Sequence, residues 1–194
     1  FLAKKLLFID YLDPRSSAAV INADDAYGGK LLENGACGAK ALGYSASGAG
    51  GGGIAPSVCA KEVRFSPRGI SARIETPCGP IDIESALVGR LNLYNVLAAA
   101  AATLALGVSP EAVAAGVRAV SHVDGRLQTV PVPKECGCHV IVDYAHTPDA
   151  MEKALGCLRE MTEGRLIAVF GCGGDRDRGK RPLMGAIGAG CADL

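Results

Sequence analysis

The hydrophobic residues of the chain follow helical and strand-like spacings in alternation. Residues 1–12 carry leucine, isoleucine and phenylalanine at helical intervals among lysines, which predicts a helix with one solvated face. Short apolar runs at 18–21 and 39–44 predict strands. Residues 25–33 predict a helix between these strands, with an aspartate cap at its start and Asn34-Gly35 at its end.

The middle of the chain changes to short strands and then to helices. Strands are predicted at 62–65, 71–76 and 81–85, because proline- and glycine-containing turns separate these runs. Residues 91–106 predict a helix, and Ser109-Pro110 predicts the capped start of another. The low-complexity run 45–53 predicts a flexible surface loop. It lacks the Lys-Ser/Thr pair that follows the glycines of a phosphate-binding loop.

The last part of the chain predicts a β-α-β-α series after a hinge at 120–126. The strands are expected at 139–142 and 166–170, with a helix starting at Thr147-Pro148 and another after the glycine-rich turn 171–174. Such a series predicts a parallel sheet covered by helices. Ligands of these sheets gather beyond the carboxyl ends of the strands, where Asp143 and residues 171–176 are expected.

Composition narrows the functional class. The chain has 194 residues with 20 basic and 20 acidic side chains, so it has no electrostatic footprint for nucleic acid. No apolar run reaches the roughly 20 residues that cross a bilayer. Its eight cysteines contain no C-x-x-C pair, which favours free thiols over disulfides or a zinc site. These features predict a cytoplasmic protein without membrane insertion.

Four segments carry a resemblance to a known family. They are AKKLLF (3–8), GRLNLYN (89–95), DGR (124–126) with VDYAHTPDAMEKAL (142–155), and VFGCGGDRDRGKRPLMG (169–185). In order and spacing they resemble the Mur ligase family, most closely its MurE type, and the last two are highly specific. The resemblance implies an α/β fold, with part of a central ATP-binding domain at 1–122 and the start of a Rossmann-like C-terminal domain at 123–194.

The resemblance also implies an activity. The family's MurE type joins a diamino acid, meso-diaminopimelate or L-lysine, to UDP-N-acetylmuramoyl-L-alanyl-D-glutamate in peptidoglycan precursor synthesis. ATP phosphorylates the terminal carboxylate of this UDP-MurNAc dipeptide, and the amino group of the diamino acid then attacks the acyl phosphate. We therefore expect ATP and Mg²⁺ as cofactors, a monomer, and no nucleic-acid partner.

Lys4, Asn92 and Asn95 match family positions that act on ATP. The resemblance implies that Lys4 is carbamylated, which would turn a cation into an oxygen ligand for Mg²⁺. Taken alone, Lys4 would be a solvated lysine on a helix face. Asn92 and Asn95 share one helix face and are expected at the adenine end of ATP, where amides donate to and accept from a base edge. Helix capping is the alternative role for Asn92.

Arg126, Asp143 and Arg176 complete the expected site. The resemblance implies that Arg126 reaches ATP from the domain junction, where its planar donor fork matches phosphate oxygens. The alternative is a surface arginine in a turn. Asp143 is expected at the end of a buried strand, accepting hydrogen bonds from both ribose hydroxyls. Arg176 is expected to bind the carboxylate of the incoming amino acid.

The chain departs from the family in two motifs. The phosphate loop G-T-x-G-K-T/S and the D-N-P-R motif that reads the amino acid are not in this sequence, so we expect the chain alone to be inactive. The choice of diamino acid stays open. Alternatives are a non-catalytic nucleotide-binding relative, a folylpolyglutamate synthase-like ligase, and an NAD-dependent oxidoreductase. The last is weak, because Asp175-Arg176 interrupts a G-x-G-x-x-G pattern.

Overall fold

The structure is a computed structural model that describes residues 6–8, 10–33, 39–48, 55–174 and 177–194. By its internal contacts the chain divides into two compact units. The first comprises Phe1–Arg64, Ile70–Ser85 and Leu93–Val120; the second comprises Phe65–Gly69, Ala86–Asn92 and Ser121–Leu194. Within the described residues no helix has the length and apolar character needed to span a membrane.

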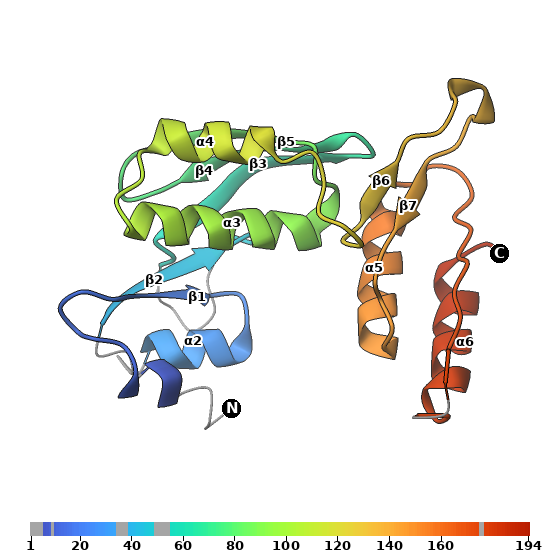
Figure 1. Cartoon of the computed structure of the whole chain (residues 1–194), viewed down its shortest axis with the longest axis horizontal. Helices are drawn as coiled ribbons and strands as arrows, with labels where there is room; N and C mark the ends of the chain where they lie inside the picture. Colours follow the sequence, from blue (N-terminus) through green and yellow to red (C-terminus); the bar gives the residue numbers. More distant parts are fainter. Residues whose placement is uncertain (1–5, 9, 34–38, 49–54, 175–176) are drawn as a thin grey trace. The chain divides into compact units, whose positions relative to one another are not determined.

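A five-stranded sheet in the order β1-β2-β3-β4-β5 lies almost wholly in the first unit (Figure 1). The strands are β1 (Ala18–Asn22), β2 (Lys40–Ser45), β3 (Val58–Ser66), β4 (Gly69–Glu75) and β5 (Ile81–Ser85). β1, β2 and β3 are parallel neighbours, whereas β4 and β5 are antiparallel. Alternate residues are buried along β5, with Ile81 and Ile83 inside, as the period of two predicts.

Among the described residues, helices α2, α3 and α4 belong to the same part of the chain as this sheet. α2 (Ala26–Glu33) contacts β1 at Gly28, where any side chain would collide with the carbonyl oxygen of Asn22. α3 (Gly89–Ala105) buries a stripe that includes Leu93, Leu97 and Leu104. α4 (Pro110–Ala119) lies against β5 and starts at the predicted Ser109 cap. The strands and helices predicted between residues 18 and 119 are therefore confirmed. Of the helix predicted at 1–12, residues 6–8 and 10 are helical, and residues 1–5 and 9 lie outside the described residues.

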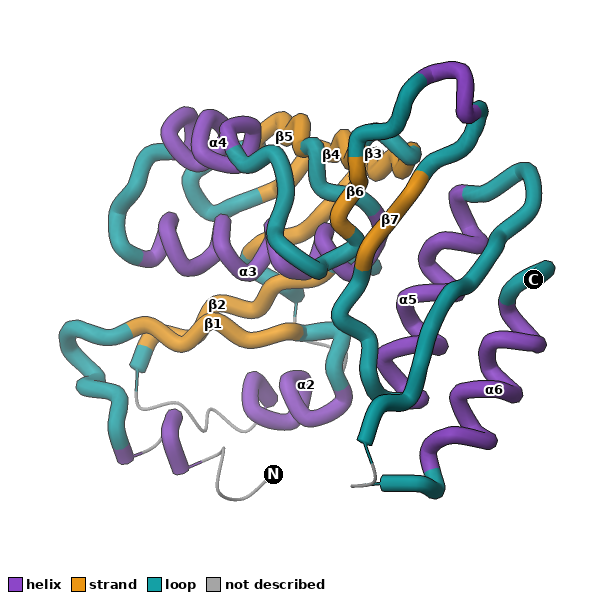
Figure 2. The backbone as a smooth tube through the Cα atoms, turned by 45° about the vertical axis from the view of Figure 1, so that its right-hand side comes forward, coloured by secondary structure: helices purple, strands orange, loops and turns teal. Residues whose placement is uncertain are grey.

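The second unit contains a hairpin and two helices. Strands β6 (Gln128–Val130) and β7 (Val140–Val142) are antiparallel, and their connection contains the short 3₁₀ helix η2 (Lys134–Cys136). α5 (Pro148–Met161) and α6 (Lys180–Cys191) lie side by side in the views of Figures 1 and 2. Met151, Leu155, Leu166 and Met184 form the core between them.

Two expectations for this unit are wrong. Residues 166–170 are not a strand, and the sheet among the described residues of this unit is antiparallel, not parallel. The carbonyl of Leu166 accepts from the N–H of Asp193 and the N–H of Ala168 donates to the carbonyl of Leu194, both at 2.8 Å. Among the described residues no strand pairs with this run. β7 is also half exposed rather than buried. The α/β fold class is nevertheless confirmed, because parallel pairing joins β1, β2 and β3.

Candidate functional site

The predicted site residues are divided between the described and undescribed parts of the chain. Lys4 and Arg176 lie outside the described residues. Asn92 and Asn95 lie in the first two turns of α3, Arg126 lies in the turn before β6, and Asp143 directly follows β7. The second unit holds Asn92, Arg126 and Asp143.

Asn92 is 2% exposed and uses its amide nitrogen within the protein. Nδ2 donates to the carbonyl oxygen of Val88 at 2.9 Å and to that of Arg126 at 3.2 Å. A side-chain amide has two N–H hydrogens, so both are committed here to backbone carbonyls. Asn95, by contrast, is exposed. Asn92 therefore has a structural function near the start of α3. It is not the helix cap considered from the sequence, because α3 already begins at Gly89 and the Asn92 amide donates to carbonyls.

Asp143 binds two backbone amides with its two oxygens. Oδ2 accepts from the N–H of Leu127 at 2.9 Å, and Oδ1 accepts from the N–H of Ala145 at 2.8 Å. An ionised carboxylate offers about four acceptor positions. Each oxygen therefore keeps the capacity to accept a hydroxyl as well, which is compatible with the expected contact to a ribose.

Asn92 and Asp143 hold opposite sides of one peptide group. The carbonyl of Arg126 and the N–H of Leu127 belong to the same peptide bond, so Asn92 binds one end of it and Asp143 the other. Leu127 has φ +44°, in the left-handed region that bulky residues seldom adopt. Three residues that the sequence placed at one site are thus joined through a single peptide.

The side chain of Arg126 is exposed beside an aromatic ring. Its guanidinium carbon lies 5.9 Å from the centroid of the Tyr144 ring, within the range of a cation–π contact. Nη1 also donates to the carbonyl of Gly125 at 3.4 Å. A guanidinium has five N–H donors, so this arrangement leaves capacity to bind an anion. Tyr144 itself is 68% exposed.

The start of α3 is held close to α5. Gly89 has φ +83°, and a Cβ atom there would collide with Sγ of Cys157. The N–H of Arg90 donates to this sulfur at 3.2 Å, and the Arg90 guanidinium lies 3.8 Å from the Glu160 carboxylate. The glycine that opens the GRLNLYN segment is therefore needed for close packing, which fixes the position of Asn92 three residues later.

Lys180 and Arg181 at the start of α6 bind backbone carbonyls of two loops. Lys180 Nζ donates to His146 at 3.2 Å, and Arg181 Nη2 donates to Gly174 at 2.8 Å. These two side chains therefore tie the loop after β7 and the glycine-rich turn to α6.

Asp24, in the first unit, makes a set of long-range hydrogen bonds that the sequence did not reveal. Its carboxylate accepts from the hydroxyls of Ser45, Ser47 and Tyr94 at 2.6, 2.7 and 2.9 Å. It also accepts from the backbone N–H groups of Ala46 and Ser47 at 2.8 and 3.1 Å. Asp24 therefore fixes residues 45–47, which were predicted as flexible, and binds Tyr94 of the GRLNLYN segment.

These contacts keep Asp24 ionised. Partial burial alone would raise its pKa, but the hydrogen bonds from Ser45, Ser47 and Tyr94 prevail and lower the pKa to about 2. Burial, together with the nearby charges of Asp25 and Asp24, raises the pKa of Tyr44. The end of β2 thus carries one fixed negative charge and no competing phenolate at neutral pH.

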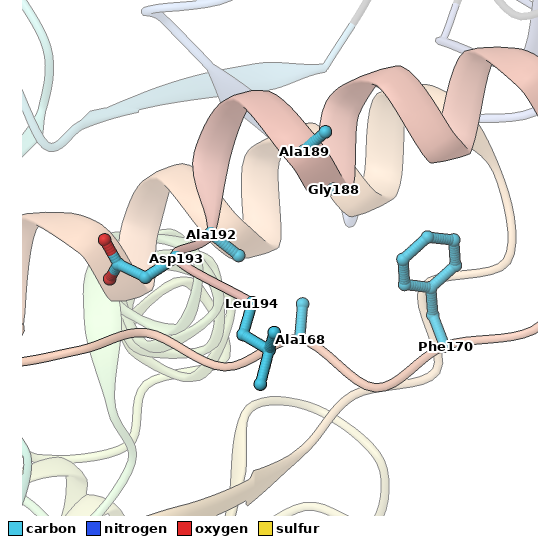
Figure 3. Close-up of a pocket in the computed structure, with 7 residues that line it drawn as sticks. All are labelled: Ala168, Phe170, Gly188, Ala189, Ala192, Asp193 and Leu194. Carbon is cyan, nitrogen blue, oxygen red and sulfur yellow. The ribbon is translucent and has the colours of Figure 1, made fainter.

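A shallow pocket in the second unit is not the predicted site. Figure 3 shows its lining, which comprises Ala168, Phe170, Gly188, Ala189, Ala192, Asp193 and Leu194. Its one charged group, Asp193, accepts from Arg159 and from the N–H of Leu166. None of the predicted residues lines it, and its walls are mainly apolar.

The described residues contain no cluster suited to a metal ion, and their cysteines are unpaired. That part of the chain contains no group of three or more His, Cys, Asp and Glu side chains arranged to hold a metal ion. The seven cysteines described have free thiols: Cys59, Cys78, Cys136, Cys138, Cys157, Cys172 and Cys191.

Comparison with protein families gives two matches along the chain. The Mur ligase middle domain matches residues 1–103, and the Mur ligase glutamate ligase domain matches residues 125–194. Together they cover all of the chain except residues 104–124.

Individual relatives agree with these matches. A UDP-N-acetylmuramoyl-L-alanyl-D-glutamate–2,6-diaminopimelate ligase of Geobacter metallireducens is 48% identical over 100% of this chain, which covers 36% of that protein. A solved structure of a ligase of the same name is 32% identical with a TM-score of 0.68, covering 98% of this chain and 38% of its own. The FPGS-AMPPCP-folate complex, at 17% identity and a TM-score of 0.66, covers 91% of this chain and 40% of its own and shares the fold alone. The chain spans little more than a third of the length of the curated relatives it matches.

Proposed function

The chain belongs to the Mur ligase family, and on this premise we propose that the protein containing it at full length is an ATP-dependent ligase of peptidoglycan precursor synthesis. It would join meso-diaminopimelate to UDP-N-acetylmuramoyl-L-alanyl-D-glutamate. The relatives matched over the whole chain carry this name, which favours diaminopimelate over L-lysine. We further propose a cytoplasmic monomer, with a boundary between its two ligase domains near residue 122.

The observation that carries this proposal is the single peptide that links three expected ATP residues. Asn92 and Asp143 bind the two ends of the Arg126–Leu127 peptide, and the Arg126 guanidinium is exposed next to it. In the proposed site Arg126 binds ATP phosphates and Asp143 accepts from the ribose hydroxyls. Asn95 contributes at the adenine end, and Asn92 supports the site through the carbonyl of Arg126.

The reaction needs two steps at the carboxylate of the dipeptide. Transfer of the γ-phosphoryl group of ATP gives an acyl phosphate and ADP. The amino group of diaminopimelate then attacks the acyl carbon and releases phosphate, forming the amide. Arg176 would orient the amino acid through its carboxylate, and Arg126 would offset the charge on the phosphates.

Mg²⁺ enters the proposal through the family resemblance alone. The donor would be a carbamate on Lys4, because a carbamate supplies the oxygen ligands that Mg²⁺ prefers. Lys4 lies outside the described residues. Its role can be tested chemically, since Lys4→Ala should lose activity and regain part of it when a short carboxylic acid is added.

A coupled assay tests the function directly. The full-length protein is incubated with ATP, Mg²⁺, the UDP-MurNAc dipeptide and either meso-diaminopimelate or L-lysine, and phosphate release and product mass are measured. We expect release that needs the dipeptide and diaminopimelate together. In a separate binding measurement, ATP binding without phosphate release in this assay would identify a non-catalytic relative. In a parallel incubation with a folate and glutamate, glutamate addition would identify a folylpolyglutamate synthase-like ligase.

A further inference from the structure

The turn that carries Arg126 contains a strained residue. Leu127 has φ +44°, a conformation in which the Cβ atom of an L-residue crowds its own backbone. Such conformations persist only when their surroundings hold them, and they are concentrated at functional sites. The strained conformation of Leu127 must therefore be stabilised by its neighbours, and it is a candidate for a function at this turn.

Three independent contacts hold the Arg126–Leu127 peptide. Asn92 donates to its carbonyl oxygen at 3.2 Å, and Asp143 accepts from its N–H at 2.9 Å. The Leu127 side chain is 2% exposed and packs with Ala154 and Cys157 of α5. The orientation of the peptide is thus fixed at both polar ends and by the side chain that follows.

The neighbouring backbone is braced as well. Arg126 N–H donates to the carbonyl of Val123 at 3.1 Å, and Tyr144 N–H donates to that of Gly125 at 2.8 Å. Because the peptide planes on both sides of the Arg126 Cα atom are fixed, the direction in which its side chain leaves the backbone is fixed too. The exposed guanidinium then lies beside Tyr144.

We propose that Leu127, with Asn92 and Asp143, acts as a positioning residue that presents the Arg126 guanidinium to the phosphates of ATP. This inference rests on the proposed function. Leu127 is buried and its N–H is already bonded, so it acts only through Arg126 and makes no contact with the nucleotide. Its left-handed backbone turns Arg126 outward while its own side chain remains in the core.

A matched pair of substitutions separates backbone conformation from packing. Isoleucine is branched at Cβ and resists positive φ, whereas methionine is unbranched and has a similar volume. In the full-length protein, Leu127→Ile should lower kcat/KM for ATP by about ten-fold or more, since small displacements of a binding group are costly. Leu127→Met should stay within about three-fold of wild type.

A double-mutant cycle identifies the residue through which Leu127 acts. In an Arg126→Ala background, Leu127→Ile should change kcat/KM for ATP by less than about two-fold, because the group it positions is gone. A loss of equal size in both backgrounds, or equal losses in Leu127→Ile and Leu127→Met, would overturn the inference. If wild type itself shows no ATP-dependent ligation, the proposed function fails instead, so the two failures are distinct.

A second pair covers the case in which Leu127→Ile does not fold. Leu127→Val and Leu127→Ala add no volume, and alanine removes more of the core contact than valine does. If packing alone mattered, alanine would be the worse substitution. The inference requires the opposite order in kcat/KM for ATP, with valine lower, and an alanine variant that is equal or lower refutes it.

Discussion

Asp24 and Asp25 are adjacent in sequence and differ in function. Oδ1 of Asp25 accepts from the N–H groups of Tyr27 and Gly28 and so caps α2, a local role that the sequence predicts. The partners of Asp24 include Ser45 and Tyr94, which lie 21 and 70 residues away along the chain. No local spacing encodes such contacts, which is why Asp24 was missed while the cap was found.

Replacing Asp24 with asparagine should destabilise the first unit and should reduce the loss of its stability between pH 4 and pH 2. Because the folded pKa of about 2 lies below the usual value of 3.8, Asp24 stabilises the fold above pH 4 and loses this contribution as pH falls toward 2. After allowance for solvent screening, this contribution is on the order of 1–2 kcal/mol. Thermal melting between pH 7 and pH 2 measures it.

Asp25→Asn is the matched control for that experiment. Asparagine caps helices about as well as aspartate, so this variant should lose only a few tenths of a kcal/mol and keep the acid response of wild type. If Asp24→Asn melts in parallel with wild type at every pH, Asp24 does not organise residues 45–47 in the manner described.

Among the helices and strands, features formed by residues close in sequence, such as helix caps, could be predicted. Features that depend on a distant partner strand could not. Ser109 and Thr147 cap α4 and α5 as the sequence indicated, since a cap is made within three residues. Residues 166–170 look like a buried strand, yet they lack a ladder among the described residues. β6 and η2 were not predicted at all, because their sequences QTV and KEC contain no apolar run of the kind that VIV gives to β7.

Gly89 and Gly107 allow the close packing at the start of α3 to be tested. They have nearly identical φ values of +83° and +84°, but a Cβ atom would meet Cys157 at Gly89 and nothing within 4 Å at Gly107. Gly107→Ala should therefore cost about 1 kcal/mol through backbone strain alone. Gly89→Ala should cost about 1–3 kcal/mol more, because the core must shift.

Chemical denaturation of both variants beside wild type provides the measurement. Equal losses of stability in the two alanine variants would mean that residues 89–92 can move away from Cys157 at little cost, and Asn92 would then not be held rigidly. Adding Cys157→Ala to Gly89→Ala should recover part of the loss, since it removes the sulfur in the way.

For the whole molecule, the order of the four segments quoted above predicted the family, which neither composition nor hydrophobic periodicity could identify. The family and the α/β fold followed from that order, and the structure adds how three of the expected residues are joined through the Arg126–Leu127 peptide. Lys4 and Arg176 remain predictions. The two arginines offer a test of how substrate binding is divided along the chain, because each is assigned to a different substrate.

Arg126→Ala and Arg176→Ala should each impair the full-length enzyme toward a different substrate. Loss of a charged hydrogen-bond donor costs about 2–3 kcal/mol, or a fall in kcat/KM of roughly thirty- to two-hundred-fold. For Arg126→Ala this fall should be found with ATP as the varied substrate, and for Arg176→Ala with diaminopimelate. The lysine variants keep the charge but lose the planar fork, so each should retain part of the activity for its own substrate. If Arg176→Ala lowers kcat/KM for ATP as much as kcat/KM for diaminopimelate, the assignment of that arginine to the amino acid is wrong. The role of Arg126 is tested separately, by its own variant.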